Sequence, residues 1–380
     1  MQLSREYFKF NKDIFVLIAS RGLNLASGLY VLYLLKSNFL ADEAGTILIW
    51  RSFVIILLTL SKSGVDSLLI RAENTEEFEG ASFWKAIYWF VGCLVTILIT
   101  GLIFNIGLLE ITMVIVIWVG SLEVYSQVKN LEKQWVRMRS LSSLCALGYL
   151  LVFVPATFKE VLYYYFVLEF FPFIFLLYKS RKNNYNILLK FPGFGLLKTS
   201  LFLSISSASI ILYSRSDIFI LKFHNLDSII VDYSIITRYV EASYIVLSSY
   251  LYFIFPKMKI YSVSDLTRKV KEVLIISSAV TILLLTLSSF YLDVFSATNS
   301  LKYLIIFLLI IPIVYLSSLL SRWLLIIGLD KILVKKSLVV LTINIVVGVL
   351  LTGRLQIWGV ILGTLSAEMV GLVILWRHAK

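Results

Sequence analysis

Residues 301–327 read LKYLIIFLLIIPIVYLSSLLSRWLLII, a run in which only Lys302 and Arg322 are charged. A helix needs about 20 apolar residues to cross the hydrocarbon core of a bilayer, so this run is long enough to span it. Similar runs recur along the whole chain of 380 residues, which is 59% hydrophobic and 15% charged, with a mean hydropathy of +0.90. Soluble domains have about 25% charged residues, so the composition excludes a soluble enzyme and a disordered chain. The sequence predicts an all-α polytopic membrane protein.

Apolar runs bounded by charged residues predict about twelve transmembrane helices, with no connection long enough to form a further domain. The shortest connections, near Asn105–Gly107 and Gly353–Arg354, predict tight hairpins between neighbouring helices. The predicted spans are 13–36, 44–70, 82–105, 108–128, 139–157, 160–178, 199–222, 228–255, 272–293, 301–327, 332–352 and 355–376.

The distribution of lysine and arginine predicts the orientation of these spans. If the N-terminus is inside, 23 of the 35 basic residues lie in cytoplasmic segments and five lie in external ones. This bias requires an even number of spans, so both termini are expected in the cytoplasm. It also explains most of the formal net charge of +12, and nucleic acid binding is therefore not expected. Arg21 interrupts the first apolar run and no small-residue cleavage site follows, so no cleavable signal is predicted.

The longest basic connection, residues 179–198 (KSRKNNYNILLKFPGFGLLK), divides the predicted spans into six and six. Its basic start and apolar middle are typical of a segment that lies along the membrane interface. We therefore predict an N-terminal six-helix lobe (1–178), a cytoplasmic interfacial linker (179–198) and a C-terminal six-helix lobe (199–380). Two six-helix bundles are typical of transporters built from parallel repeats.

Charged residues inside the predicted spans indicate a functional site, because a charge in the bilayer core has to face protein or water. In span 228–255, Arg238 lies about 15 Å from the start of the helix, and Glu241 follows one turn later and can pair with it. These two residues share one helix face with four others, Ser234, Thr237, Tyr244 and Ser248. The stripe predicts a water-filled cavity; the alternative is an internal ion pair that only fixes packing.

Other spans carry polar residues that would line the same cavity. Span 13–36 aligns Arg21, Asn24 and Gly28; span 44–70 places Arg51, Lys62 and Asp66 on one side; span 199–222 is rich in serine and contains Arg215 and Asp217. An inner surface with net positive charge suits an anionic substrate, because arginine can hold phosphate oxygens bidentately. Lys85 and Arg322 lie near cytoplasmic helix ends, where we expect them to snorkel to the interface.

The sequence contains no pattern typical of an ATP-driven pump, a metal site or a hydrolase. Its two histidines, His224 and His378, lie near loops, and its two cysteines, Cys93 and Cys145, lie in apolar runs. No catalytic residue, cofactor or metal is therefore predicted, and transport is favoured over enzymatic activity. An integral-membrane glycan polymerase or ligase stays open as an alternative, although the short external connections leave little room to hold sugars.

One group of residues resembles a known family. The segment Arg215-Ser-Asp-Ile-Phe-Ile-Leu, Tyr233 and Phe255-Pro256 resemble the seventh and eighth helices of Wzx-like polysaccharide flippases. Ala44-Gly45 and the segment from Ser63-Gly64-Val65 to Arg71 fit the same pattern. These flippases belong to the multidrug, oligosaccharidyl-lipid and polysaccharide (MOP) exporter superfamily, together with MATE drug exporters and lipid II flippases. The resemblance implies two six-helix lobes in the bacterial inner membrane, around a cationic cavity that opens alternately to either side.

The same resemblance implies a substrate and residue roles. The substrate would be an undecaprenyl-diphosphate-linked oligosaccharide. Lipid II flippases carry cavity arginines on helices one, two and eight, which Arg21, Arg51 and Arg238 match by helix. These three would bind the diphosphate, and the further cavity residues would be Arg215, Asn24 and Lys62. Glu241 and Asp66 would reset the arginines or carry a coupling cation, and Asp217 would be a further charge partner.

The energy source is H⁺, Na⁺ or the membrane potential alone, and a glycan polymerase is a candidate partner. The chain lacks a thirteenth and a fourteenth helix, which disfavours lipid II as the cargo. The alternative within transport is a MATE-type antiporter for cationic drugs, which should have an acidic cavity.

Overall fold

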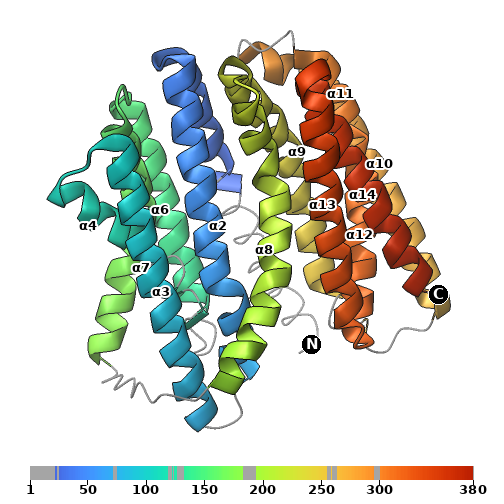
Figure 1. Ribbon diagram of the computed structural model, residues 1–380, viewed down its shortest axis with the longest axis horizontal. Helices are drawn as coiled ribbons and strands as arrows, with labels where there is room; N and C mark the ends of the chain where they lie inside the picture. The colour runs from blue at the N-terminus through green and yellow to red at the C-terminus, as the bar shows by residue number, and fades with distance from the viewer. Residues whose placement is uncertain are drawn as a thin grey trace, which may run out of the picture. The chain divides into compact units, whose positions relative to one another are not determined.

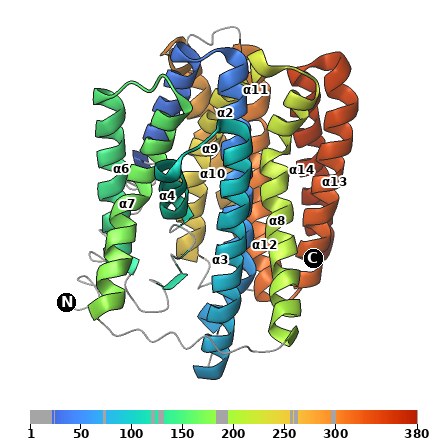
Figure 2. The same cartoon turned by 60° about the vertical axis from the view of Figure 1, so that its left-hand side comes forward.

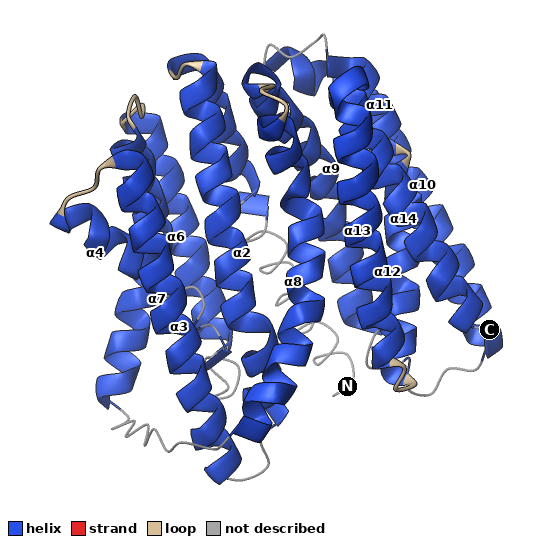
Figure 3. Cartoon of the chain, in the orientation of Figure 1, coloured by secondary structure: helices blue, strands red, loops and turns tan. Residues whose placement is uncertain are grey.

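The computed structural model describes residues 22–23, 25–71, 75–118, 122, 124–125, 132–182, 194–254, 258, 263–294 and 300–379. Within these ranges the regular elements are helices and no strand occurs, which confirms the all-α expectation (Figure 3). A helix over residues 25–38 precedes the labelled helices. Those are α2 (Ala41–Arg71), α3 (Thr75–Phe104), α4 (Leu108–Ile117), α6 (Glu132–Val152), α7 (Phe158–Lys182), α8 (Phe194–Phe223), α9 (Asp227–Ile254), α10 (Val263–Val294), α11 (Leu301–Leu308), α12 (Ile310–Ile326), α13 (Asp330–Leu355) and α14 (Ile357–Ala379) (Figure 1).

Seven segments of the described chain are long and apolar enough to cross a membrane. They are Ala41–Ser61, Glu77–Phe104, Phe158–Lys179, Ser264–Val294, Leu301–Ile326, Lys331–Leu355 and Ile357–Ala379. Each of the predicted spans overlaps a described helix, so the chain is a multi-pass membrane protein. The total of twelve spans and the cytoplasmic position of the termini stay predictions.

The run at 301–327 was expected to form one helix, but the structure breaks it at Leu309 into α11 and α12. Pro312 explains the break, because it has no N–H to donate to the carbonyl of Leu308 one turn earlier, and its ring crowds that carbonyl. The two pieces together still form one apolar span, Leu301–Ile326.

Tight hairpins join two pairs of helices. Asn105–Gly107 connects α3 to α4 as predicted; Asn105 adopts a φ of 47°, and the backbone N–H of Gly107 donates to Glu110 Oε2 at 2.9 Å. The second hairpin lies slightly later than predicted, since Gly353–Arg354 belongs to the last turn of α13. The chain reverses at Gln356, whose φ is 52°, a left-handed conformation that ends the helix.

Contacts divide the chain into two compact units. Unit 1 contains the described residues up to Leu40 together with Ile49–Ile211, and unit 2 contains Ala41–Leu48 together with the described residues from Leu212 onwards. Helices α2 and α8 therefore contribute to both units. Within unit 1, α6 packs along α7 (Figure 2), and within unit 2, α13 packs along α14.

The predicted lobe boundary at 179–198 stays a prediction. Lys179–Lys182 continue α7 and the first residues after 193 begin α8, whereas residues 183–193 lie outside the described residues.

The largest hydrophobic core described in unit 1 lies where α2, α3, α4 and α7 meet. Its buried residues are Trp50, Val54, Cys93, Met113, Val114, Ile117, Trp118 and Leu162. Gly92 lets the ring of Trp118 pack against the backbone of α3, because a Cβ there would overlap that ring. Outward positions on α3 are also apolar, such as Leu98 and Leu102, and they are exposed in the isolated chain. Exposed apolar side chains on a long helix are expected where the helix contacts lipid.

Candidate functional site

A charged cluster in unit 2 is formed by Arg215 of α8 and by Arg238 and Glu241 of α9. Arg238 Nη1 donates to Glu241 Oε2 at 2.7 Å, which confirms the predicted pairing. Arg215 Nη2 lies 3.7 Å from the other carboxylate oxygen, Oε1. The sequence did not predict this second contact, because a position on α8 cannot be placed beside α9 from spacing alone.

These three side chains are partly accessible. The exposed fractions are 16% for Arg215, 18% for Arg238 and 27% for Glu241. Two guanidinium groups and one carboxylate give the cluster a net charge of +1. Guanidinium groups donate paired N–H groups to carboxylate or phosphate oxygens, so this cluster can bind an anion.

Three tyrosine hydroxyls hold the opposite face of α9. Tyr291 of α10 donates to the carbonyl of Ile235 at 3.0 Å, and Tyr315 of α12 donates to the carbonyl of Ser243 at 2.6 Å. Tyr239 donates from α9 to the carbonyl of Leu284 at 2.6 Å. Positions 235, 239 and 243 follow each other at helical spacing, so α9 is fixed in rotation.

The predicted polar stripe on α9 is partly reproduced. Thr237, Tyr244 and Ser248 are half-buried, like the charged pair, whereas Ser234 is buried. Ser234 was expected to face the cavity, and its burial corrects that expectation. Ser234 lies on the same helix face as Arg238 and Glu241, one and two turns before them, so the buried part of this face is its N-terminal end.

A second polar cluster surrounds Asp217, which is only 6% exposed. Tyr233 of α9 donates a hydrogen bond to Asp217 Oδ2, and Thr364 of α14 donates to the same oxygen at 3.2 Å. Asn344 of α13 donates through Nδ2 to Asp217 Oδ1 at 3.1 Å and to Ser216 Oγ at 2.9 Å. The buried carboxylate is thus held by hydrogen-bond donors from three helices.

Asn344 leaves one strong acceptor unused in this cluster. Its side chain is fully buried, and its Oδ1 has no hydrogen-bond partner among the described residues. A Cβ on Gly363 would lie 3.1 Å from this oxygen and 3.0 Å from the backbone nitrogen of Gly348, so α13 and α14 pack closely here. Carboxylate, amide and hydroxyl oxygens are the ligands of hard cations, and a buried carboxylate is also a proton acceptor.

The sequence predicted Asp217 but not its partners Asn344 and Thr364. A lone asparagine inside an apolar helix is a signal that could have identified Asn344, because an amide is costly to bury without a partner. No similar signal distinguishes Thr364, since threonine hydroxyls satisfy themselves on their own helix.

In unit 1, Arg51 of α2 lies beside Tyr165 and Gly28. Its guanidinium carbon is 5.6 Å from the centre of the Tyr165 ring, within the range of a cation–π interaction. Its Nη2 is 3.7 Å from the position of a Cβ on Gly28. The structure thus brings Arg51 to the helix that was predicted to carry Arg21 and Asn24.

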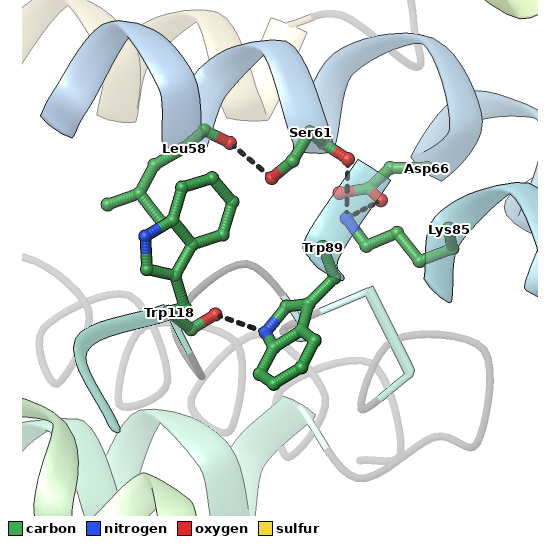
Figure 4. Close-up of polar contacts among 6 residues, drawn as sticks. All are labelled: Leu58, Ser61, Asp66, Lys85, Trp89 and Trp118. Carbon is green, nitrogen blue, oxygen red and sulfur yellow. Dashed lines mark hydrogen bonds and ion pairs between the residues drawn. The ribbon is translucent and has the colours of Figure 1, made fainter. Parts of the chain in front are cut away.

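Asp66 of α2 has a partner that the sequence did not predict (Figure 4). Lys85 of α3 donates through Nζ to Asp66 Oδ1 at 2.6 Å and to the carbonyl of Ser61 at 2.8 Å. The Lys85 side chain is fully buried, so the expected snorkelling of Lys85 is wrong. One turn further along α3, the indole of Trp89 donates to the carbonyl of Trp118, where α4 ends.

Three predicted site residues cannot be placed. Arg21 and Asn24 lie outside the described residues, and of Lys62 only the backbone, within α2, is described. The described site residues form separate groups: Arg215, Arg238, Glu241 and Asp217 in unit 2, and Arg51 and Asp66 in unit 1. No group of three or more His, Cys, Asp and Glu side chains is placed to hold a metal ion in the described part of the chain.

Comparisons with known proteins address the fold. No protein-family model and no curated protein sequence matches the chain. Solved structures do match over nearly its whole length. A crystal structure of MATE in complex with MaL6 has a TM-score of 0.67 and 15% identity, covering 96% of this chain and 94% of that one.

Two further structures extend this likeness. An outward-facing multidrug resistance MATE transporter of the MOP superfamily has a TM-score of 0.66 and 14% identity, covering 97% of this chain and 92% of that one. The lipid II flippase MurJ in its inward closed conformation has a TM-score of 0.67 and 15% identity, covering 96% of this chain and 87% of that one. The Wzx-type assignment stays a prediction. The chain has the fold of these MATE structures and of the lipid II flippase MurJ.

Proposed function

We propose that this protein is a flippase that moves a polyprenyl-diphosphate-linked oligosaccharide across the bacterial inner membrane by alternating access, without making or breaking a covalent bond. The observation that carries the proposal is the pair of partly exposed arginines, Arg215 and Arg238, inside helices of unit 2. Both lie in the predicted spans 199–222 and 228–255, and charged residues inside a membrane span face protein or water and mark substrate pathways. The lipid II flippase MurJ has the same fold, which supports a lipid-linked substrate.

Arginines would provide the diphosphate site. A diphosphate that enters the membrane loses hydration, and fixed guanidinium groups replace it with charge-assisted hydrogen bonds. Arg215 and Arg238 would act in unit 2 and Arg51 in unit 1. The proposal assigns the same role to Arg21, Asn24 and Lys62.

Asp217 is a better candidate than Asp66 for the residue that binds the coupling cation, H⁺ or Na⁺. The carboxylate of Asp66 already has a cationic partner at 2.6 Å in Lys85, whereas Asp217 is surrounded by neutral hydrogen-bond donors and the unused Oδ1 of Asn344. A buried carboxylate whose hydrogen-bond partners are all neutral is costly, and a bound cation or proton would lower that cost. Glu241 would return Arg215 and Arg238 to a paired state once the substrate has left.

The test uses vesicles that contain the purified protein and a fluorescent polyprenyl-diphosphate-linked sugar, and it measures how much label becomes accessible to an impermeant quencher. Arg238→Ala should abolish this transport while the protein still inserts, because the substrate loses a charge-assisted partner. Arg238→Lys keeps the charge but loses the planar guanidinium group with its paired N–H donors, so we expect partial transport. Arg268→Ala, at an exposed position on α10, is the matched control and should transport normally.

The double variant Arg238→Ala with Glu241→Ala separates substrate binding from packing. If the two residues form only a structural pair, removing both should restore stability and transport together. If Arg238 binds the diphosphate, the double variant should fold and still fail to transport, and normal transport would refute the proposal. In cells, a deletion strain should lose a surface glycan and accumulate the lipid-linked unit.

A MATE-type antiporter for cationic drugs is the second candidate, favoured by the buried acidic group Asp217 and by the matching MATE structures. The two functions predict different phenotypes. An antiporter should lower the susceptibility of cells to cationic drugs, and Asp217→Asn should abolish that protection. A flippase should leave drug susceptibility unchanged and alter the surface glycan.

A further inference from the structure

Glu241 uses both of its carboxylate oxygens to hold arginines that come from different helices. Oε2 accepts a hydrogen bond from Arg238 Nη1 at 2.7 Å, and Oε1 lies 3.7 Å from Arg215 Nη2. Arg238 is one turn away on α9, whereas Arg215 is on α8. The carboxylate therefore keeps two guanidinium groups close together that would otherwise repel each other.

A carboxylate and a phosphate group compete for the same N–H groups of an arginine. Both present oxygens in the geometry that a guanidinium recognises, and both form charge-assisted hydrogen bonds. A phosphate that approaches this cluster finds the N–H group of Arg238 already occupied by Glu241. All three side chains are partly exposed, so a ligand can reach them without opening the core.

We propose that Glu241 is a displaceable competitor of the anionic ligand: it occupies Arg215 and Arg238 when the site is empty, and a diphosphate displaces it on binding. This inference rests on the proposed function and adds the direction in which Glu241 changes the affinity for the anion. Glu241 should weaken binding of the anion and speed its release, because the carboxylate returns to the arginines as the phosphate leaves. Removing the carboxylate should therefore tighten binding and slow transport.

The test measures binding of inorganic pyrophosphate to the detergent-solubilised full-length protein by calorimetry at constant ionic strength. Glu241→Gln should bind about tenfold more tightly than the wild type, since the ligand no longer competes with a charge-assisted hydrogen bond. Glu241→Asp keeps the charge, but its shorter side chain cannot reach both arginines. It should therefore also bind more tightly, by a smaller factor. If only the net charge of the cluster mattered, Glu241→Asp would bind pyrophosphate with the same affinity as the wild type.

Glu272→Gln is the matched control. Glu272 also holds two cations, Arg268 at 3.4 Å and Lys269 at 2.5 Å, but near the start of α10, so its loss should change the affinity by less than about twofold. In the vesicle assay, Glu241→Gln should transport several-fold more slowly despite its tighter binding. A residue that only supports folding would not give this combination.

The outcomes separate this inference from the function on which it rests. Equal or weaker pyrophosphate binding by a monodisperse Glu241→Gln protein, beside measurable binding by the wild type, would overturn the displacement idea and leave the flippase proposal intact. The same holds if Glu241→Asp binds like the wild type. If the wild type binds neither pyrophosphate nor the lipid diphosphate, the proposed function fails and takes this inference with it.

Discussion

At the level of single residues, the least expected feature is Lys85, whose side chain is fully buried and bound to Asp66 at 2.6 Å. Removing one partner of a buried ion pair leaves an uncompensated charge and typically costs about 3–5 kcal/mol, whereas replacing both partners is often nearly neutral. We therefore predict that Lys85→Met lowers the melting temperature of the purified protein strongly, and that Lys85→Met with Asp66→Asn recovers most of the loss.

Two results would check this prediction. Arg268→Gln, which breaks an exposed ion pair on α10, should leave the melting temperature nearly unchanged, because surface pairs contribute about 0–1 kcal/mol. If Lys85→Met melts like the wild type, the buried pair does not stabilise unit 1. The sequence could not predict this pair, because a lysine near a helix end can either snorkel or turn inward, and hydropathy does not distinguish the two.

At the level of helices, α13 and α14 owe their close approach to glycine. A Cβ on Gly359 would lie 2.3 Å from the backbone nitrogen of Thr352, and one on Gly371 would lie 2.8 Å from a methyl group of Val340. Small residues on the facing sides of two helices let their backbones approach closely in a membrane. This packing also keeps Asn344 beside Thr364 and Asp217, so the hairpin builds the buried polar cluster.

We predict that Gly359→Ala separates these two helices and lowers thermal stability, because the new methyl group meets backbone that cannot move aside. The matched control is Gly148→Ala in α6, where nothing lies within 4 Å of the added Cβ. There alanine should stabilise the helix by about 0.5–1 kcal/mol through its higher helix propensity. Melting temperatures that fall equally for both variants would contradict the role of close packing.

Helix existence was the part of the fold that the sequence predicted best, because a long apolar run between charges has few other structures available in a membrane. The sequence predicted less well those features that depend on contacts with other residues and helices. The break at Leu309 required weighing Pro312 against a run that is otherwise uninterrupted. The contact of Arg215 with Glu241 joins two helices, and no periodicity within either helix contains that information.

At the level of the whole molecule, hydropathy predicts the spans but not their grouping. Residues Ala41–Leu48 belong to unit 2, although they begin the same helix whose later residues belong to unit 1. A hydropathy pattern states how apolar a segment is and carries no information on which neighbours it contacts. The basic residues supply a different kind of global information, because they report the side of the membrane on which each connection lies.

The last prediction uses that information and depends on α4. This helix has 10 residues, about 15 Å at 1.5 Å per residue, which is half of the bilayer core, so the predicted span 108–128 has to continue beyond Ile117 to cross it. If it crosses, Asn183 and His378 lie on the cytoplasmic side, in agreement with the basic residues of 179–198. If it does not, the number of spans before Asn183 becomes odd, and Asn183 lies opposite the N-terminus.

We predict that fluorescent-protein fusions after Asn183 and after His378 are both fluorescent, because these reporters mature in the cytoplasm. A phosphatase fusion at Asn225, between α8 and α9, should be active outside. A phosphatase that is active when fused after Asn183 would show that the segment following α4 returns to the side from which it came, and the twelve-span topology would then be wrong.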